Sequence, residues 1–163
     1  MLQFILLLIV ASIITFVIIK LYYLFSYKSQ TENFKSATYI YLNKKINFLP
    51  TLLNEIKLNI GETDEVISLI KIRNQFNDQE GIRKNLDLIH ECNRSFGVIF
   101  TNYPNLLENY ELSNLRNQWY EMDANLNSNA NLYIQAAQNY NAMFSDFICS
   151  KVISLLKYEQ EII

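Results

Sequence analysis

The sequence predicts an all-α protein in which one N-terminal transmembrane helix precedes an antiparallel up-and-down bundle of three long helices. Glycine and proline are scarce, with 3 and 2 among 163 residues, and half of the residues are apolar. Turns are therefore few and helices can be long. An unbroken apolar run opens the chain, and apolar residues then recur at intervals of three and four. We divide the chain into an anchor, residues 1–27, and a helical bundle domain, residues 28–163.

The apolar run covers residues 4–19, with Ser12 and Thr15 as mild polar interruptions, and apolar and aromatic residues continue after Lys20 through residue 25. About 22 residues of helix measure roughly 33 Å, which is enough to cross a bilayer. Lys20 can extend its ammonium group to the membrane surface, and the tyrosines that follow it are typical of that interface. We therefore expect residues 2–25 to contact the lipid bilayer.

A cleavable signal peptide is the main alternative for this run. Such a peptide needs basic residues before its apolar core and a small-x-small cleavage site after it. Residues 1–19 contain no Lys or Arg, and the run ends in the bulky sequence KLYYLFSYK. A buried core helix is the other alternative, but the run has no polar face. We therefore prefer a single-pass anchor.

The basic residues predict the orientation of this anchor. None precedes the run, and five follow it: Lys20, Lys28, Lys35, Lys44 and Lys45. The positive-inside rule then places a short N-terminus outside and the bundle domain in the cytoplasm. Lys44 and Lys45 lie about 25 Å or more along the helix, so we expect them to contact solvent or a partner and not lipid.

The first rod of the bundle is predicted over residues 28–60. Its apolar residues keep nearly the same phase on both sides of Pro50, which predicts a kink there and not a reversal. Gly61 is placed to follow the helix end, and Thr63 to cap the next helix, whose first turn is acidic. The apolar positions are Phe34, Ala37, Tyr41, Ile46, Leu49, Leu52, Leu53, Ile56 and Ile60.

The second rod is predicted over residues 63–102 and contains a polar patch at 77–81. The patch is either an irregular turn within one helix or a full turn, which would make four helices. Gly97 lies inside this rod and costs about 1 kcal/mol relative to alanine. We expect a closely packed neighbouring helix to be the reason for it.

The third rod is predicted over residues 105–150, with Pro104 in its first turn and Asn102 or Asn105 as its cap. Steps of three and four connect its apolar residues, as in a coiled coil. Three rods of similar length, about 50–70 Å each, joined by short turns favour antiparallel neighbours. The apolar series is Leu112, Leu115, Trp119, Met122, Leu126, Ala130, Tyr133, Ala137, Tyr140, Phe144 and Phe147.

Four sequence motifs occur in order after the apolar run. "LNKKINFLPTLL", from Leu42, resembles the pattern Leu-Lys-Arg-Arg-x-Asp-Leu-Ile-Pro-Asn-Leu-Val of the LemA family, and "YPNLLEN", from Tyr103, resembles its Tyr-Pro-Asp-Leu-Lys-Ala-Asn. Tyr133 and Tyr140-Asn141 resemble two Tyr-Asn pairs, and Phe147 falls at a Phe-Pro position. The chain thus resembles a LemA family member.

The resemblance has departures as well as matches. Thr51, Ile134 and Ile148 replace an Asn, an Asn and a Pro of the family patterns, and the chain ends soon after its Phe-Pro position. We therefore expect a divergent, C-terminally short member. The resemblance implies a helical bundle with an external N-terminus in the inner membrane of a bacterium, without established enzymatic activity.

No motif in the sequence predicts a catalytic, cofactor-binding or metal site. His90, Glu91 and Cys92 are consecutive, so on a helix they point about 100° apart and cannot share one ion. Glycine-rich phosphate loops and nucleophile elbows are absent. Cys92 and Cys149 lack a CxxC spacing and are expected as reduced thiols. The net charge of −2 argues against nucleic acid as a partner.

The preferred function is a membrane-anchored, non-enzymatic scaffold or interaction protein of the LemA type. Its helical faces would bind a protein partner or a second copy of the chain. The alternative is a membrane-tethered sensor or small-ligand-binding bundle, in which Trp119 and the tyrosines of the third rod line a groove. An Asn- and Gln-rich face of that rod is either solvated or a protein-binding surface: Asn125, Asn127, Asn129, Asn131, Gln135, Gln138 and Asn139.

Overall fold

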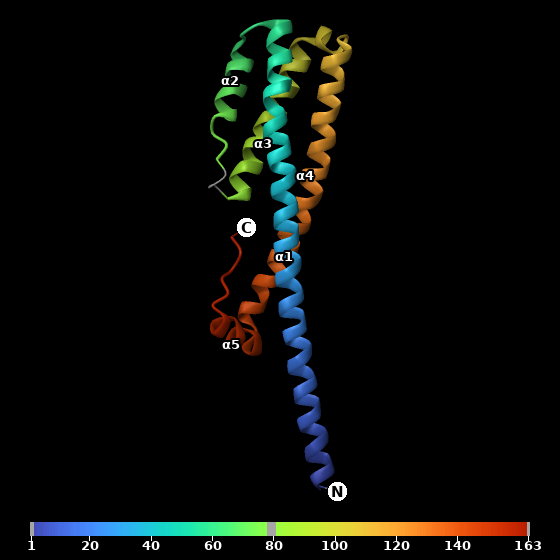
Figure 1. Ribbon diagram of the computed structural model, residues 1–163, viewed down its shortest axis with the longest axis vertical. Coiled ribbons are helices and arrows are strands. Elements are labelled where there is room, and N and C mark those ends of the chain that lie inside the picture. The colour runs from blue at the N-terminus through green and yellow to red at the C-terminus, as the bar shows by residue number, and fades with distance from the viewer. Residues whose placement is uncertain (1, 78–80, 163) are drawn as a thin grey trace. The chain divides into compact units, whose positions relative to one another are not determined.

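The computed structural model describes residues 2–77 and 81–162, and this part of the chain is helical, with no strand (Figure 1). The predicted all-α class is therefore confirmed. The residues form two compact units, one made of Met1–Lys35 with Asn131–Ile163 and the other of Ser36–Ala130. Helices α1 (Leu2–Ile60) and α4 (Tyr110–Ala142) contribute residues to both.

Helix α1 is continuous from the apolar run to Ile60, and Pro50 lies inside it. The predicted boundary between anchor and bundle at residue 27 lies within this helix, because no helix-breaking residue separates the two parts. Gly61 ends the helix as predicted: its φ is +76°, and its N–H donates to the Lys57 carbonyl oxygen at 2.8 Å. Glycine adopts this left-handed conformation without strain.

Two separate helices occupy the predicted second rod. Helix α2 (Asp64–Arg73) is capped by Thr63, whose hydroxyl oxygen accepts from the Val66 N–H at 3.4 Å, as predicted. Helix α3 (Ile82–Asn102) begins after the polar patch. The patch therefore separates two helices, although residues 78–80 of it lie outside the described residues.

The corner at Pro104 differs from the prediction in detail. Pro104 opens a short 3-10 helix, η1 (Pro104–Leu107), and α4 begins only at Tyr110. The Asn109 side chain accepts from the Leu112 N–H at 3.1 Å and so caps α4. The predicted start at 105, with Asn102 or Asn105 as the cap, is wrong because a proline fits the first turn of a 3-10 helix equally well.

The third rod also ends earlier than predicted. Helix α4 stops at Ala142, the 3-10 turn η2 (Met143–Ser145) follows, and a separate helix α5 (Phe147–Leu156) begins. Asp146 causes this division, because its carboxylate accepts from the N–H groups of Ile148 and Cys149, both at 3.1 Å. Phe147 consequently leaves the apolar series and is 78% exposed.

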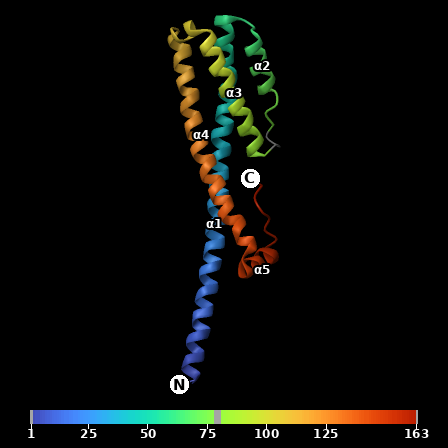
Figure 2. The ribbon, with the colours of Figure 1, turned by 180° about the vertical axis from the view of Figure 1, so that it is seen from behind.

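The core of the Ser36–Ala130 unit combines side chains from α1, α2, α3 and α4. Figures 1 and 2 show α2 and α3 beside the C-terminal part of α1. Trp119 is fully buried and meets Phe96 edge-on, with ring centroids 5.1 Å apart. Burial of each large apolar side chain contributes about 1.5–3 kcal/mol. Other fully buried members are Leu49, Leu52, Ile56, Val66, Leu69, Ile99, Leu112 and Leu126.

The buried stripe of α1 includes polar residues. Side chains seven residues apart, Leu24, Thr31, Thr38, Lys45 and Leu52, are each at most 1% exposed. The predicted apolar positions before Leu49 are only partly buried: Phe34, Ala37, Tyr41 and Ile46. The prediction failed here because an apolar pattern ignores threonines that bond to their own helix, as Thr31 does to the Tyr27 carbonyl at 2.8 Å.

Gly97 is exposed, and a Cβ built on it would meet nothing within 4 Å. The expected close approach of a neighbouring helix is therefore wrong.

Candidate functional site

The first part of α1 presents an apolar surface on all sides. Its most apolar window has no buried residue, and among the described residues it is the one helix long and apolar enough to cross a membrane. The large side chains of this surface are between 47% and 68% exposed: Phe4, Ile5, Leu6, Leu7, Leu8, Ile9, Val10, Ile13, Ile14, Phe16, Ile18 and Ile19. By length and composition, this surface is consistent with a helix that crosses a membrane.

The two polar side chains within this surface are satisfied by the helix itself. The Ser12 hydroxyl donates to the Leu8 carbonyl oxygen, and the Thr15 hydroxyl donates to that of Ala11, both at 2.9 Å. Each hydroxyl therefore has a partner without water, which is the condition for burial in hydrocarbon.

The apolar surface ends at Lys20, which contacts α5. The Lys20 ammonium lies 2.7 Å from the Asp146 carboxylate, and the Cys149 thiol lies 3.7 Å from the Lys20 carbonyl oxygen. The hydrogen bond with Lys20 and the backbone N–H of Cys149 lower the pKa of Asp146 to about 2. Asp146 therefore stays charged and keeps both its capping and its pairing role at neutral pH.

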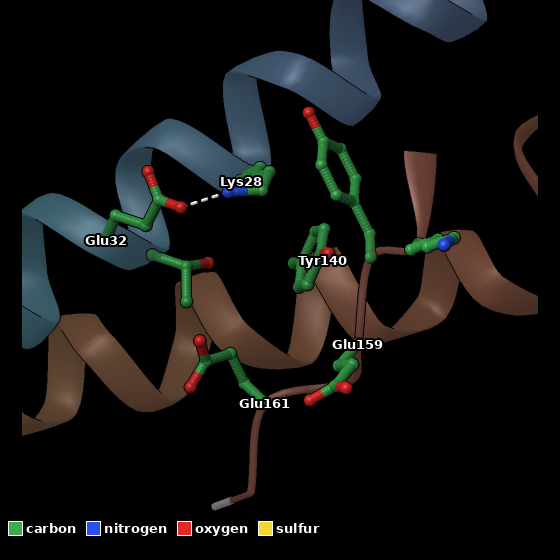
Figure 3. A pocket seen from close by; sticks show the side chains of 8 residues that line it. Lys28, Glu32, Tyr140, Glu159 and Glu161 are labelled. Carbon is green, nitrogen blue, oxygen red and sulfur yellow. Dashed lines mark hydrogen bonds and ion pairs between the residues drawn. The ribbon is translucent and has the colours of Figure 1, made fainter. Parts of the chain in front are cut away.

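A polar pocket of about 270 Å³ lies in the same unit (Figure 3). Lys28 and Glu32, which form an ion pair on α1, face Tyr140 of α4 and the acidic C-terminal segment across it. The Lys28 ammonium also lies 4.7 Å from the centre of the Tyr158 ring. The lining residues are Lys28, Thr31, Glu32, Tyr140, Lys157, Tyr158, Glu159 and Glu161.

The C-terminal segment is held in place at Glu161. Asn141 makes two reciprocal hydrogen bonds with the Glu161 backbone, both 2.9 Å long. The Glu161 carboxylate accepts from the Tyr133 hydroxyl at 3.1 Å and pairs with Lys35 at 2.7 Å. The pocket is thus closed on one side by a segment that α1 and α4 both hold.

A second polar cluster is buried in the core of the other unit. The Lys45 side chain has no exposed surface, pairs with Asp123, and lies 4.1 Å from the centre of the Trp119 ring. Asn93 accepts from the Trp119 N–H at 2.7 Å and donates to Asp123 at 3.0 Å. Burial lowers the pKa of Lys45, although Asp123 opposes that shift.

The expectation that Lys45 contacts solvent or a partner is wrong, whereas Lys44 is exposed. The sequence carried a signal for this cluster. Lys45 continues the spacing of three and four that connects Leu42, Leu49 and Leu52, so it occupies a core position of α1.

The residues considered for chemistry in the sequence do not come together. His90 and Glu91 are exposed, whereas Cys92 is fully buried, and burial raises the pKa of its thiol to about 12. Cys149 is buried as well, and both cysteines are free thiols. Among the described residues no group of His, Cys, Asp and Glu side chains could hold a metal ion.

Three aromatic residues of the predicted third rod are core residues. Trp119, Tyr133 and Tyr140 are at most 3% exposed. The Asn- and Gln-rich face of α4 is exposed or half-buried along its length. Trp119 and Tyr133 are therefore packed in the protein interior, whereas Tyr140 also lines the polar pocket.

The sequence profile of the LemA family matches residues 35–163. The chain belongs to the LemA family. No curated protein and no solved structure matches it. The LemA motifs have structural roles: Tyr103 follows the end of α3, Pro104 opens η1, and Tyr133 with Asn141 holds the C-terminal segment. The apolar residues 4–25 lie outside the matched range, so their interpretation rests on their own surface.

Proposed function

We propose that this LemA family chain is a membrane-anchored scaffold protein without enzymatic activity. One observation carries the proposal: the wholly apolar, unburied surface of α1 before Lys20, in which Ser12 and Thr15 are satisfied by backbone carbonyls. Such a surface fits the hydrocarbon core of a bilayer.

The proposed topology is a single pass with the N-terminus outside and residues 28–163 in the cytoplasm of a bacterial cell. The lysines that follow the apolar surface support this orientation. We further propose that the C-terminal part of α1, with α2, α3 and α4, forms an antiparallel up-and-down bundle. Their shared core supports this arrangement.

The polar clusters support a structural and not a catalytic role. Lys45 pairs with Asp123, Lys20 with Asp146, and Lys35 with Glu161, so each ammonium already has a carboxylate partner inside the protein. The burial of Trp119 and Tyr133 in the core argues against a ligand-binding groove along the apolar series of α4. The partner is instead a protein or a second copy, bound by exposed helical faces that include Leu58 and Tyr110, which are 80% and 86% exposed.

Cysteine labelling in intact bacterial cells tests the topology. Gln3→Cys and Ser128→Cys place one exposed thiol on each side of the apolar surface, and the buried Cys92 and Cys149 provide the background. A maleimide that cannot cross membranes should label Gln3→Cys in intact cells, and Ser128→Cys only after the cells are permeabilised. Labelling of Ser128→Cys in intact cells would reverse the orientation.

Cross-linking in native membranes tests the scaffold role. We expect a defined protein, or the chain itself, to be recovered with wild type and lost when Tyr110 or Leu58 is replaced by a charged residue. Recovery of lipid alone would remove the partner from the proposal.

A further inference from the structure

Helix α5 has one face against the protein and another face uncovered. Cys149 and Ile153 are buried in a small apolar cluster with Leu24 of α1 and Tyr140 of α4. On the opposite side Phe147 and Leu155 are 78% and 80% exposed. Two large apolar side chains of this ten-residue helix are therefore left uncovered by the unit.

The contacts of α5 locate this uncovered face. Its capping residue Asp146 pairs with Lys20, the residue at which the apolar surface of α1 ends, and Cys149 contacts the Lys20 carbonyl oxygen. Helix α5 therefore begins beside the residue at which the apolar surface of α1 ends. Figures 1 and 2 both show α5 nearly end-on while α1 runs along the page, so α5 crosses the direction of the anchor.

The residues near Lys20 and the start of α5 are of the types found at a membrane interface. On α1, Tyr22, Tyr23 and Phe25 are 70%, 46% and 46% exposed. On α5, Lys151 is exposed and lies on the same side as Phe147, with its ammonium 6.0 Å from the centre of that ring. Aromatic and leucine side chains that enter the acyl boundary, next to a lysine that extends to phosphate, are typical of helices lying in the interface.

We propose that α5 lies in the headgroup region of the leaflet from which the anchor emerges, with Phe147 and Leu155 in contact with acyl chains and Lys151 with lipid phosphate. The occupant of the uncovered face is thus the bilayer, because α5 begins in contact with Lys20, the residue at which the apolar surface of α1 ends. This inference rests on the proposed membrane anchoring and adds a second point of attachment beside the anchor.

Depth-dependent quenching tests the proposal. The full chain, with Cys92 and Cys149 replaced by alanine, receives one cysteine carrying an environment-sensitive fluorophore at Leu155, at Ile9 or at Ser128. Each labelled protein is reconstituted into vesicles of phosphatidylcholine and phosphatidylglycerol that carry no nitroxide, a nitroxide near the top of the acyl chains, which reports on Leu155, or a nitroxide near their ends, which reports on Ile9. Ile9 reports on the anchor, and Ser128, which is exposed in the other unit, is the aqueous control.

The expected result is strong quenching of the fluorophore at Leu155 and none at Ser128. Quenching at Ile9 without quenching at Leu155 overturns this inference and leaves the anchor intact, whereas no quenching at Ile9 overturns the anchor itself. A blue-shifted but unquenched fluorophore at Leu155 would mean that a second copy of the chain covers α5, which also overturns the inference.

A variant without labels gives an independent result. In the same vesicles, trypsin should cleave after Lys151 several-fold faster in the Phe147→Ser, Leu155→Ser double variant than in wild type. Both side chains are exposed, so the substitutions leave the buried face unchanged. Equal cleavage rates would contradict an α5 held by lipid.

Discussion

Two lysines of α1 pair with aspartates, and their surroundings differ. In the Ser36–Ala130 unit the Lys45 side chain has no exposed surface, and Asp123 keeps 16%. In the other unit Lys20 and Asp146 keep 30% and 22% of their side-chain surface exposed. The first pair is enclosed by the Trp119 ring and the Asn93 amide, whereas the second lies at the start of α5.

The two environments determine what each ion pair contributes to the stability of the fold. A buried ammonium loses its hydration, and its partner offsets that loss without adding much net stability. The buried pair therefore determines which residues of α1, α3 and α4 contact one another. Stability is lost only when one member of the pair is removed and the other charge stays buried. The partly buried Lys20–Asp146 pair is more accessible to water, and it contributes mainly by holding the capping residue of α5 in place.

The largest effect is expected from Asp123→Leu. Removal of the carboxylate leaves the Lys45 charge buried without a partner, and such a change costs about 3–5 kcal/mol. Trp119 is the only tryptophan of the chain and lies in the cluster, so its fluorescence during urea unfolding of the full chain in detergent micelles measures this loss.

The double variant Lys45→Met, Asp123→Leu is the matched control. It replaces both charges by apolar groups of similar size, and its unfolding midpoint should return close to that of wild type. If Asp123→Leu alone unfolds like wild type, the pair is not the buried contact described above.

A smaller and local effect is expected from substitutions of Asp146. Asp146→Ala removes both the cap and the ion pair, whereas Asp146→Ser keeps a capping oxygen and removes only the charge. Hydrogen exchange of the α5 amides should be fastest in the alanine variant and intermediate in the serine variant. Trp119 fluorescence should show no change, since the residue reports on the other unit. Equal exchange in all three proteins would show that the cap does not hold α5.

The pH dependence of α5 follows from the same carboxylate. The pKa of Asp146 is about 2 in the folded chain and near its ordinary value of 3.8 when the chain is unfolded. Its stabilising effect is therefore complete above pH 3.8 and is lost as the pH falls towards 2. Exchange protection of α5, corrected for the intrinsic rates, should fall over this interval in wild type and stay level in Asp146→Asn. A level profile in wild type would contradict the assignment.

The smallest effect is a gain from Gly97→Ala. The position is helical and exposed, and an added Cβ has open space around it. Alanine should raise the free energy of unfolding by up to about 1 kcal/mol, measured by the same fluorescence transition. A loss of stability would mean that α3 is packed at Gly97 by something outside this chain.

Features that rest on local chemistry were predictable from the sequence. Gly61 ends α1 through its positive φ, and Thr63 starts α2 through its capping oxygen. Each of these features depends on only one or two residues. The apolar series of α4 from Leu112 to Tyr140 was predictable because the residues at its three-and-four spacing are the ones that are buried. Ser145 and Asp146 are capping residues and so indicated the start of α5. The three-and-four spacing of the apolar series continued across them to Phe147, however, and concealed the end of α4.

The buried polar residues were harder to predict. Thr31, Thr38 and Lys45 lie on the buried stripe of α1, where a search for apolar spacing selects their neighbours instead. Their burial depends on partners distant in sequence, as Asp123 is for Lys45, which no local pattern contains. The contact between Lys20 and Asp146 was unpredictable for the same reason.

The central claim is that the apolar surface before Lys20 lies in a bilayer while the rest of the chain folds outside it. Alkaline carbonate extraction of bacterial membranes tests this claim most directly, with wild type compared to Ile9→Arg, Ile13→Arg. Each arginine at the centre of a membrane helix costs about 2.5–3.5 kcal/mol. We predict that wild type stays with the membrane pellet and that the double variant is released with its Trp119 fluorescence unchanged. Release of wild type into the supernatant would contradict the account.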